Sequence, residues 1–552
     1  MRPPEPKFEI AVVSDMPVDV PGGAEHADLR TASQYAWQEF IAMNWPAKAG
    51  VRDTPDPQSK FGQPVAPGGA LVWETFRSKV EIYPGNGSAT QGPPGWNSGA
   101  PDFGYDAPPQ YTYATNVPPC GAAADRPAAW VNLDEISEIG FASMHAGISG
   151  GSLFRYLAKA NRVHYRYVVA NQYWYGFLTA GTPAAIAPGD FVKAVQHFPF
   201  SIPAGAPIVD FPDGTIEIKA AFRPLTKAES ASGRFHKTQV RRYERGADGN
   251  ACYAEDEWGL MALHIIHKTP TAPAWTWTTF EQADNLMTTV NGNAVPVEDD
   301  DGNVLHPGPA NTPALSYEDG PYAPGLLPKV STNGPYCTDP GIRLFYQNIA
   351  VDSQGKPYEN IPTGGNICVG ERMRRIPKTV VDTNRAAHQA IAEYERRNGL
   401  PPSPWHHYKL VNVQTWPFDK ANIVPNDDSH RGAPTFYTSN IVVETNYTLQ
   451  NHSGGPETHT GAAPSDLSRN FADLPQPPAE PTYKNTYLMS DRTLRARYNM
   501  GGCMGCHGLT QIVVGSDFSY ILFESSVTKP EFPETTAVEL TPRYIGRLER
   551  VR

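Results

Sequence analysis

The stretch Thr215-Ile-Glu-Ile-Lys-Ala-Ala-Phe-Arg223 alternates between apolar and polar side chains and follows a Pro-Asp-Gly turn at 212–214. A period of two residues is typical of a β-strand, because successive side chains point to opposite faces of a sheet. Two further stretches, Gly259-Leu-Met-Ala-Leu-His-Ile-Ile-His-Lys268 and Ala274-Trp-Thr-Trp-Thr-Thr-Phe-Glu-Gln282, are rich in strand-forming residues. The centre of the chain therefore predicts a mainly β protein.

The composition agrees with this prediction. Among 552 residues there are 48 Gly and 55 Pro, aromatic residues make up 11%, and charged residues make up only 19%. Aromatic residues pack well on pleated sheets, while Pro and Gly mark turns. We expect an α+β fold that is mainly β with peripheral helices, built as an antiparallel sandwich or barrel-like body.

Working outward from the central strands, the spacing of apolar residues predicts further elements. Helices are expected from Thr31 to Pro46 with Thr31 or Ser33 as cap, within 135–160, from Asn384 to Asn398 with Gly399 as cap, and from Thr486 to Tyr498. Strands are expected at Leu71–Phe76, His164–Asn171, Trp405–Trp416 and Ser439–Tyr447.

The net charge restricts the partners. A formal charge of −11 argues against nucleic acid and anionic lipid surfaces, and no basic run contradicts this. No apolar run reaches the roughly 18 residues that a transmembrane helix needs, so we expect no membrane span.

Near the end of the chain lies Cys503-Met-Gly-Cys506-His507, which has the spacing of a c-type haem attachment motif. Each thiol would add to one vinyl group of the porphyrin, and His507 would be the proximal axial ligand of the iron. Half of a zinc site or a redox dithiol are the alternatives, but neither requires a histidine directly after the second cysteine. We therefore expect one covalent haem c.

The sixth iron ligand is not apparent, because neither His nor Met follows His507. A ligand would have to come from upstream, or the position would be open. His264 and His267 are the first candidates; in a strand they point to opposite faces, so at most one could face the haem. Met489 and Met500 come next.

The other four cysteines allow two disulfides in an oxidising compartment. Cys337 and Cys368 are the nearest pair in sequence, although spacing does not determine connectivity, and Cys120 and Cys252 are the remaining two. Because haem is attached covalently outside the bacterial cytoplasm, we expect a periplasmic or secreted protein. The N-terminus shows no leader peptide, so we expect that the leader is absent from this numbering.

Several stretches together resemble the bacterial proteins described as "cytochrome c family protein" of the large monohaem type. The matching stretches are Trp37-Gln-Glu-Phe-Ile-Ala-Met-Asn-Trp-Pro46, Val72-Trp-Glu-Thr-Phe76, Leu263-His-Ile-Ile-His-Lys-Thr-Pro270, Trp275-Thr-Trp-Thr-Thr-Phe-Glu-Gln-Ala-Asp-Asn285, Trp405-His-His-Tyr-Lys-Leu-Val-Asn-Val-Gln-Thr-Trp-Pro417, Asn485-Thr486, the haem motif and Asp517-Phe-Ser-Tyr-Ile-Leu522. The resemblance implies a single covalent haem on a large exported body, and it assigns no reaction.

Two functions follow as hypotheses. The first is a periplasmic monohaem cytochrome that transfers electrons to a redox partner protein. The second is a haem-dependent oxidoreductase of peroxidase or oxygenase type, with an open or weakly ligated distal position. An adhesive or carbohydrate-binding β scaffold that uses the haem as a sensor is a third alternative. The oligomeric state is not predicted.

The chain divides, by this interpretation, into a large β-rich body at 1–480 and a haem-binding segment at 481–552 packed on that body. A polar, Pro-rich connection at 452–481 separates the two. Arg492, Arg495 and Arg497 precede the motif and are candidates for pairing with the haem propionates, with a solvated helix face as the alternative.

Overall fold

The strand β8 (Ala251–Thr269) is 19 residues long and pairs with β6, β7 and β9 in the main sheet. The computed structural model describes residues 10–85, 91–122, 127–136, 141–144, 152–175, 209–306, 344–347, 366–368, 372, 375–416, 440–443, 487–488, 495–496, 503–504, 507, 517–523 and 529–532.

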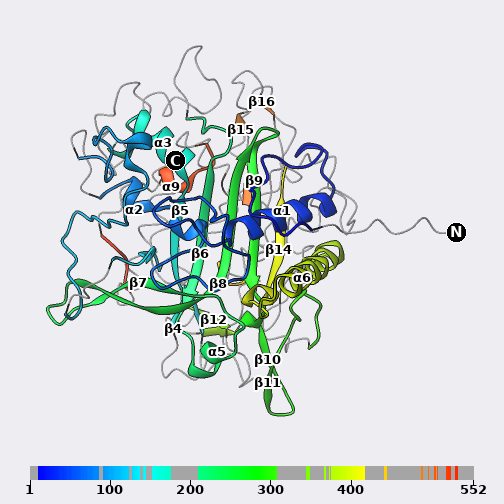
Figure 1. The fold of residues 1–552 in the computed structure, drawn as a ribbon. Helices are drawn as coiled ribbons and strands as arrows, with labels where there is room; N and C mark the ends of the chain where they lie inside the picture. The colour runs from blue at the N-terminus through cyan, green and yellow to red at the C-terminus, as the bar shows by residue number, and fades with distance from the viewer. Residues whose placement is uncertain are drawn as a thin grey trace, which may run out of the picture.

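The main sheet has eight described strands and nearly closes into a barrel (Figure 1). Besides β8, they are β1 (Arg77–Ser78), β2 (Val131–Leu133), β5 (Arg155–Ala160), β6 (Ile216–Arg223), β7 (Lys237–Arg245), β9 (Ala272–Gln282) and β14 (Tyr408–Gln414). Neighbours pair antiparallel, except that β2 runs parallel to β7, so the sheet is mixed. The predicted β-rich α+β body is confirmed.

The remaining described strands form smaller sheets. They are β3 (Phe141–Met144), β4 (Ser152–Leu153), β12 (Leu344–Gln347) and β13 (Asn366–Cys368) in one sheet, and the pairs β10 (Met287–Val290) with β11 (Asn293–Pro296) and β15 (Tyr487–Leu488) with β16 (Arg495–Ala496).

The two longest described helices are α1 (Leu29–Met43) and α6 (Lys378–Asn398). The other described α-helices are α2 (Lys79–Ile82), α3 (Arg162–Ala170), α5 (Lys227–Ala231) and α9 (Tyr520–Phe523). The described 3₁₀ turns are η1 (Trp73–Thr75), η2 (Pro101–Gly104), η3 (Tyr173–Tyr175), η4 (Ala283–Asn285) and η6 (Pro404–His407).

One face of the sheet is covered by α1 and α6, which pack on each other and on β14 (Figure 1). The apolar stripe of α1 forms the core on this side. Phe40 stacks on Phe280 of β9 with ring centroids 4.2 Å apart, and Trp37 meets Phe280 edge-on. The opposite face is therefore the one on which other segments can dock.

Several predicted elements are confirmed. The alternating stretch is β6, and the two stretches after it lie within β8 and β9. The predicted helix ending at Asn398 is α6, which begins earlier, at Lys378, and ends at Gly399 in the left-handed conformation (φ 65°). The predicted strand at 405–416 is β14, although its first residues form η6.

Two predictions near residue 160 are wrong. The helix expected within 135–160 is replaced by strands β3, β4 and β5, because residues 155–160 pair with β6. The strand expected at 164–171 is the helix α3. Asn161 caps it by accepting the His164 N–H, and its buried residues (His164, Tyr165, Val168 and Val169) follow helical spacing.

Four further predictions need correction. Residues 73–75 form a 3₁₀ turn instead of a strand, held by the Glu74 carboxylate, which accepts the Leu71 N–H. Residues 441–443 form a turn, and the helix expected at 486–498 is replaced by β15 and β16 where the chain is described. The cap of α1 is Asp28, whose carboxylate accepts the Thr31 N–H, so the helix begins at Leu29.

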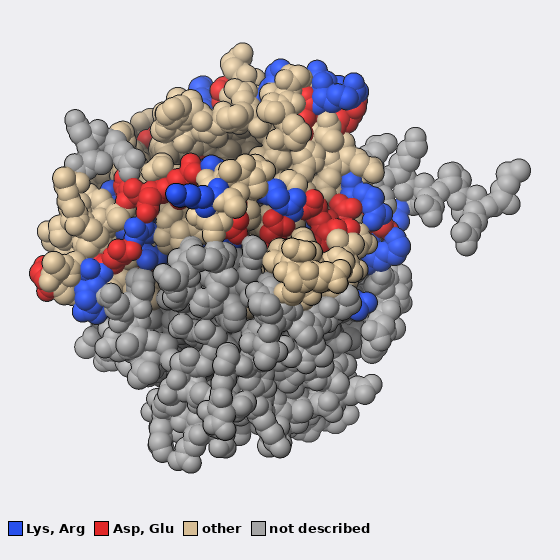
Figure 2. All heavy atoms as spheres, turned by 90° about the horizontal axis from the view of Figure 1, so that it is seen from below, with Lys and Arg blue, Asp and Glu red and all other residues tan. Residues whose placement is uncertain are grey.

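None of the described helices is both long enough and apolar enough to cross a membrane. Figure 2 views the molecule from below and shows Lys and Arg side chains mixed with Asp and Glu in one band across the described part. Among the described residues, this band therefore mixes both signs of charge, and the absence of a nucleic-acid partner stays a prediction.

Candidate functional site

The described residues between 503 and 523, which we call the C-terminal motif segment, pack on the face of the sheet opposite α1. Met504 and Phe518 are buried with Ile266 of β8 and Trp277 of β9 in one apolar cluster, and Cys503 lies against it. Ile521, from α9, joins the same cluster, as do residues of α3. Cys506 lies outside the described residues.

The register of the sheet identifies the side chains beneath the motif. On β8, His264, Ile266 and Lys268 alternate with residues that face α1, and Ile266 lies opposite Trp277 of β9. Trp277 in turn lies opposite Gln414 of β14, whose Oε1 accepts the Met504 N–H at 3.2 Å. Strands far apart in sequence thus supply the floor of the site.

His507 sits between aromatic rings and a backbone carbonyl. Its ring centroid lies 4.2 Å from that of Trp277 and 4.6 Å from that of Tyr520. Its Nδ1 lies 3.0 Å from the Phe518 carbonyl oxygen, so the N–H at Nδ1 donates to this carbonyl. Burial lowers the pKa of His507 to about 3, and the charge of Lys219 acts in the same direction. The imidazole is therefore neutral at physiological pH.

Cys503, Met504 and His507 have helical backbone conformation. Cys503 and His507 are four positions apart, the separation between the first thiol and the ligand histidine of a c-type haem motif. A thiol and a neutral imidazole in this relation fit the attachment chemistry of a c-type haem, and His507 would hold the iron.

The residues just before α9 are tied to the sheet by buried charges. Asp517 accepts from Lys268 Nζ at 2.7 Å and from the Phe211 N–H at 2.9 Å. Lys268 also pairs with Asp210. Burial raises the pKa of Asp517 to about 6, with Lys268 acting in the opposite direction. This contact joins the C-terminal segment to β8.

A second polar contact comes from β6. Ser519 Oγ donates to Glu217 Oε1 at 2.6 Å, and both side chains are buried. Sequence reasoning does not single out Glu217 or Lys268, because Glu217 belongs to the polar half of an alternating strand and no motif includes Lys268 as a site residue. The stretch 517–522 was noticed in the resemblance, and its contacts explain how that stretch is used.

The two candidate distal histidines lie on opposite faces of β8, as expected for a strand. His267 faces α1, where its Nδ1 lies 2.9 Å from Glu39 Oε1 and 3.0 Å from the Tyr35 hydroxyl. His264 lies on the same sheet face as Ile266, and its Nε2 is 3.3 Å from Thr279 Oγ1. The structure thus separates His267 from the motif and leaves His264 as the candidate.

Other predicted site residues fall largely outside the described part of the chain. Met489, Met500, Arg492 and Arg497 belong there, and Arg495 is described in its backbone alone, within β16. Their proposed roles stay predictions, as does the boundary between 1–480 and 481–552.

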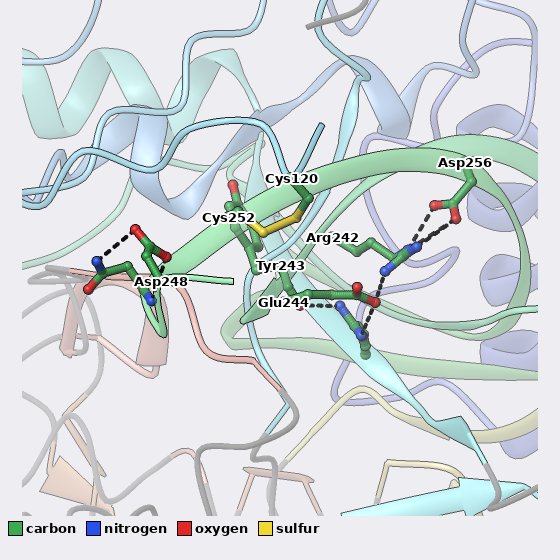
Figure 3. Close-up of a disulfide and its surroundings, with 9 residues drawn as sticks. Cys120, Arg242, Tyr243, Glu244, Asp248, Cys252 and Asp256 are labelled. Carbon is green, nitrogen blue, oxygen red and sulfur yellow. Dashed lines mark hydrogen bonds and ion pairs between the residues drawn. A yellow bond between two sulfur atoms is a disulfide. The ribbon is translucent and has the colours of Figure 1, made fainter. Parts of the chain in front are cut away.

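A disulfide joins Cys120 to Cys252 at the start of β8, beside the hairpin of β7 and β8 (Figure 3). The Cys120 N–H also donates to the Tyr253 carbonyl at 2.8 Å. In the same close-up, Arg242 of β7 pairs with Asp256 of β8 at 2.9 Å. Cys337 lies outside the described residues, so the predicted pairing of Cys337 with Cys368 is untested.

Comparison of the chain with protein-family models, with curated proteins and with solved structures found no match.

Proposed function

We propose that the protein is a monohaem c-type cytochrome, with the haem attached through Cys503 and Cys506 and ligated by His507. The observation that carries the proposal is the contact of His507 Nδ1 with the Phe518 carbonyl at 3.0 Å. Histidines that ligate metals usually donate their other ring N–H to a carbonyl or carboxylate, which fixes the tautomer and orients the ring.

The protonation state of His507 supports this role. With the proton on Nδ1, the lone pair of the imidazole is on Nε2, the nitrogen that an iron would need. The low pKa keeps the ring neutral over the physiological range, and the Phe518 carbonyl places the proton on Nδ1. Trp277 and Tyr520 restrict rotation of the ring from two sides.

A bound haem would supply a one-electron couple. The chain's own contribution is to orient His507, to exclude water with the apolar cluster around Met504 and Phe518, and to surround the site with buried charges. Axial ligation, burial and hydrogen bonding are the means by which a protein tunes such a potential. Electron transfer to a redox partner protein is therefore the proposed activity.

One observation, together with the proposed haem attachment, supports an exported location. The Cys120–Cys252 disulfide is typical of an oxidising compartment. Covalent haem attachment in bacteria takes place outside the cytoplasm, and the resemblance to large monohaem cytochromes agrees with this. A periplasmic or secreted protein is thus part of the proposal.

The position of His264 favours a second candidate function, a haem-dependent oxidoreductase of peroxidase or oxygenase type. This histidine lies on the same sheet face as Trp277, the ring that contacts His507. A distal histidine can act as general acid and base on a haem-bound oxygen ligand. The choice depends on whether His264 binds the iron or faces an open position.

Mass spectrometry of the purified protein and optical spectra with carbon monoxide test both candidates. We expect the mass of one haem and a low-spin ferrous spectrum that carbon monoxide leaves unchanged, with His264→Ala making the iron reactive to carbon monoxide. Ready binding by the wild-type protein would favour the oxidoreductase, and a mass without haem would contradict both.

His267→Ala is the matched control, since it removes the same ring from the other face of the same strand. We expect its spectrum to match wild type, while its stability falls by about 3 kcal/mol because buried Glu39 loses its partner. A His264→Ala spectrum equal to that of His267→Ala would exclude His264 as a ligand.

A further inference from the structure

The turn Asp517-Phe518-Ser519, which supplies the carbonyl for His507, has an unusual backbone. Asp517 has φ 49° and Phe518 has φ 66°, both in the left-handed region. For residues with a side chain this region costs about 1–2 kcal/mol each, and a bulky aromatic residue is seldom found there. Such conformations persist where surrounding contacts over-determine them, often at ligand clamps.

Contacts on both sides of Phe518 hold this turn. On one side Asp517 is fixed by Lys268 Nζ and by the Phe211 N–H. On the other side Ser519 Oγ donates to Glu217 Oε1 at 2.6 Å. Phe518 itself is buried against Trp277. The direction of the Phe518 carbonyl is therefore set by side chains of β6 and β8.

Glu217 lies beside a buried histidine. His164 Nδ1 is 3.2 Å from Glu217 Oε1, although the two atoms form no hydrogen bond. His164 Nε2 lies 3.0 Å from the Tyr83 hydroxyl. All three side chains are almost inaccessible to solvent.

The two sets of contacts meet at Phe211. Its ring stacks on His164 with centroids 4.5 Å apart, and its N–H donates to Asp517 at 2.9 Å. Displacing Glu217 or His164 would therefore disturb both ends of the turn. The contacts of Asp517 and those of Ser519 are therefore coupled through Phe211.

We propose that Glu217 and Ser519 are positioning residues for the axial histidine, which hold the Phe518 carbonyl at His507 Nδ1 and thereby set the haem potential. The inference rests on the proposed function. A firm hydrogen bond at Nδ1 makes the imidazole a stronger donor, and a stronger donor favours ferric iron. Loosening the turn weakens that bond and makes the haem easier to reduce.

The test is a spectroelectrochemical titration of the haem in the full-length protein with Ser519→Ala. We expect the equilibrium constant for reduction to rise about tenfold, which corresponds to about 59 mV for one electron. Ser519→Thr keeps the hydroxyl and should restore the wild-type potential. A merely structural role would leave the potential unchanged in all three proteins.

Ser33→Ala is the matched control, because Ser33 is equally buried and donates its hydroxyl to the Leu29 carbonyl at 2.6 Å on the far side of the sheet. Its potential should equal that of wild type. If Ser519→Ala does not accumulate, Glu217→Gln replaces it; this variant keeps an acceptor oxygen for Ser519, and we expect a smaller shift in the same direction.

The outcomes separate the two proposals. A wild-type protein without haem overturns the proposed function. A haem-bearing protein in which neither Ser519→Ala nor Glu217→Gln changes the potential overturns the positioning role alone, as does an equal shift in Ser33→Ala.

Discussion

At the scale of single residues, the functional side chains are set by their neighbours in space. His264 and His267 are three positions apart and of the same type, yet one faces the motif segment and the other pairs with Glu39. Sequence reasoning could state that they diverge but not which of them faces the motif. That choice depends on which face of β8 is covered by α1.

Lys159 is a buried ionisable side chain that no pattern in the sequence predicts. It is inaccessible to solvent and donates to the carbonyls of Glu74 and Trp130, both at 2.6 Å. Burial lowers the pKa of Lys159 from 10.5 to about 7. Above this value the folded protein holds the lysine neutral, while the unfolded chain still binds the proton.

We therefore predict that Lys159 makes the folded state more stable as pH rises from about 7 towards 10.5, by at most about 1.4 kcal/mol per pH unit. Lys159→Met should remove this slope. Urea unfolding at several pH values measures it, and Lys237→Met, at a partly exposed lysine of β7, is the control. Equal slopes in wild type and Lys159→Met would contradict the prediction.

At the scale of elements, sequence patterns predicted the secondary structure correctly where a single periodicity or capping signal was clear. The alternation in β6 and the cap of α6 are local signals, and both are present in the structure. Residues 164–171 are rich in strand-forming types, yet they form α3, because Asn161 caps the first turn and a helical stripe is buried. Tertiary packing outweighed intrinsic propensity there.

Gly399 gives a test of the predicted helix end. Its φ of 65° disfavours any residue with a Cβ, and an added Cβ would meet no other atom within 4 Å. Gly399→Ala should therefore lower the free energy of unfolding by about 1 kcal/mol through the backbone alone.

Chemical denaturation measures this change. Gly121→Ala is the control, since an added Cβ there also meets nothing within 4 Å and no left-handed φ is involved. A loss of stability in Gly121→Ala as large as in Gly399→Ala would show that the backbone conformation is not the cause.

At the scale of the whole molecule, contacts join described segments that are far apart in the sequence. The C-terminal motif segment meets β6, β8, β9 and β14, and Glu531 contacts Asp134 and Ile136 near β2. The Cys120–Cys252 disulfide closes a further long loop, with a sequence separation of 132. The disulfide persists when the chain unfolds, so it restricts the unfolded chain over this distance.

We predict that replacing both Cys120 and Cys252 with Ser lowers the free energy of unfolding by about 4 kcal/mol, because the unfolded chain regains the entropy of this loop. Urea unfolding without added reductant, which leaves the wild-type disulfide intact, measures the free energy of unfolding of both proteins. An unchanged unfolding midpoint would contradict the prediction. The haem spectrum should not change, since the disulfide lies at the opposite end of β8 from Ile266.

The central strands, the β-rich class and the end of α6 could be predicted from the sequence, and the haem at Cys503-Met-Gly-Cys-His507 stays a prediction; each depends on spacing between residues close in the chain. The surroundings of His507 come from tertiary contacts: the Phe518 carbonyl, the hydrogen bond of Ser519 to Glu217, and the placement of His264 and His267 on opposite faces of β8. These depend on strand register and on which face of the sheet each segment covers. Contacts between residues hundreds of positions apart leave no local period in the sequence.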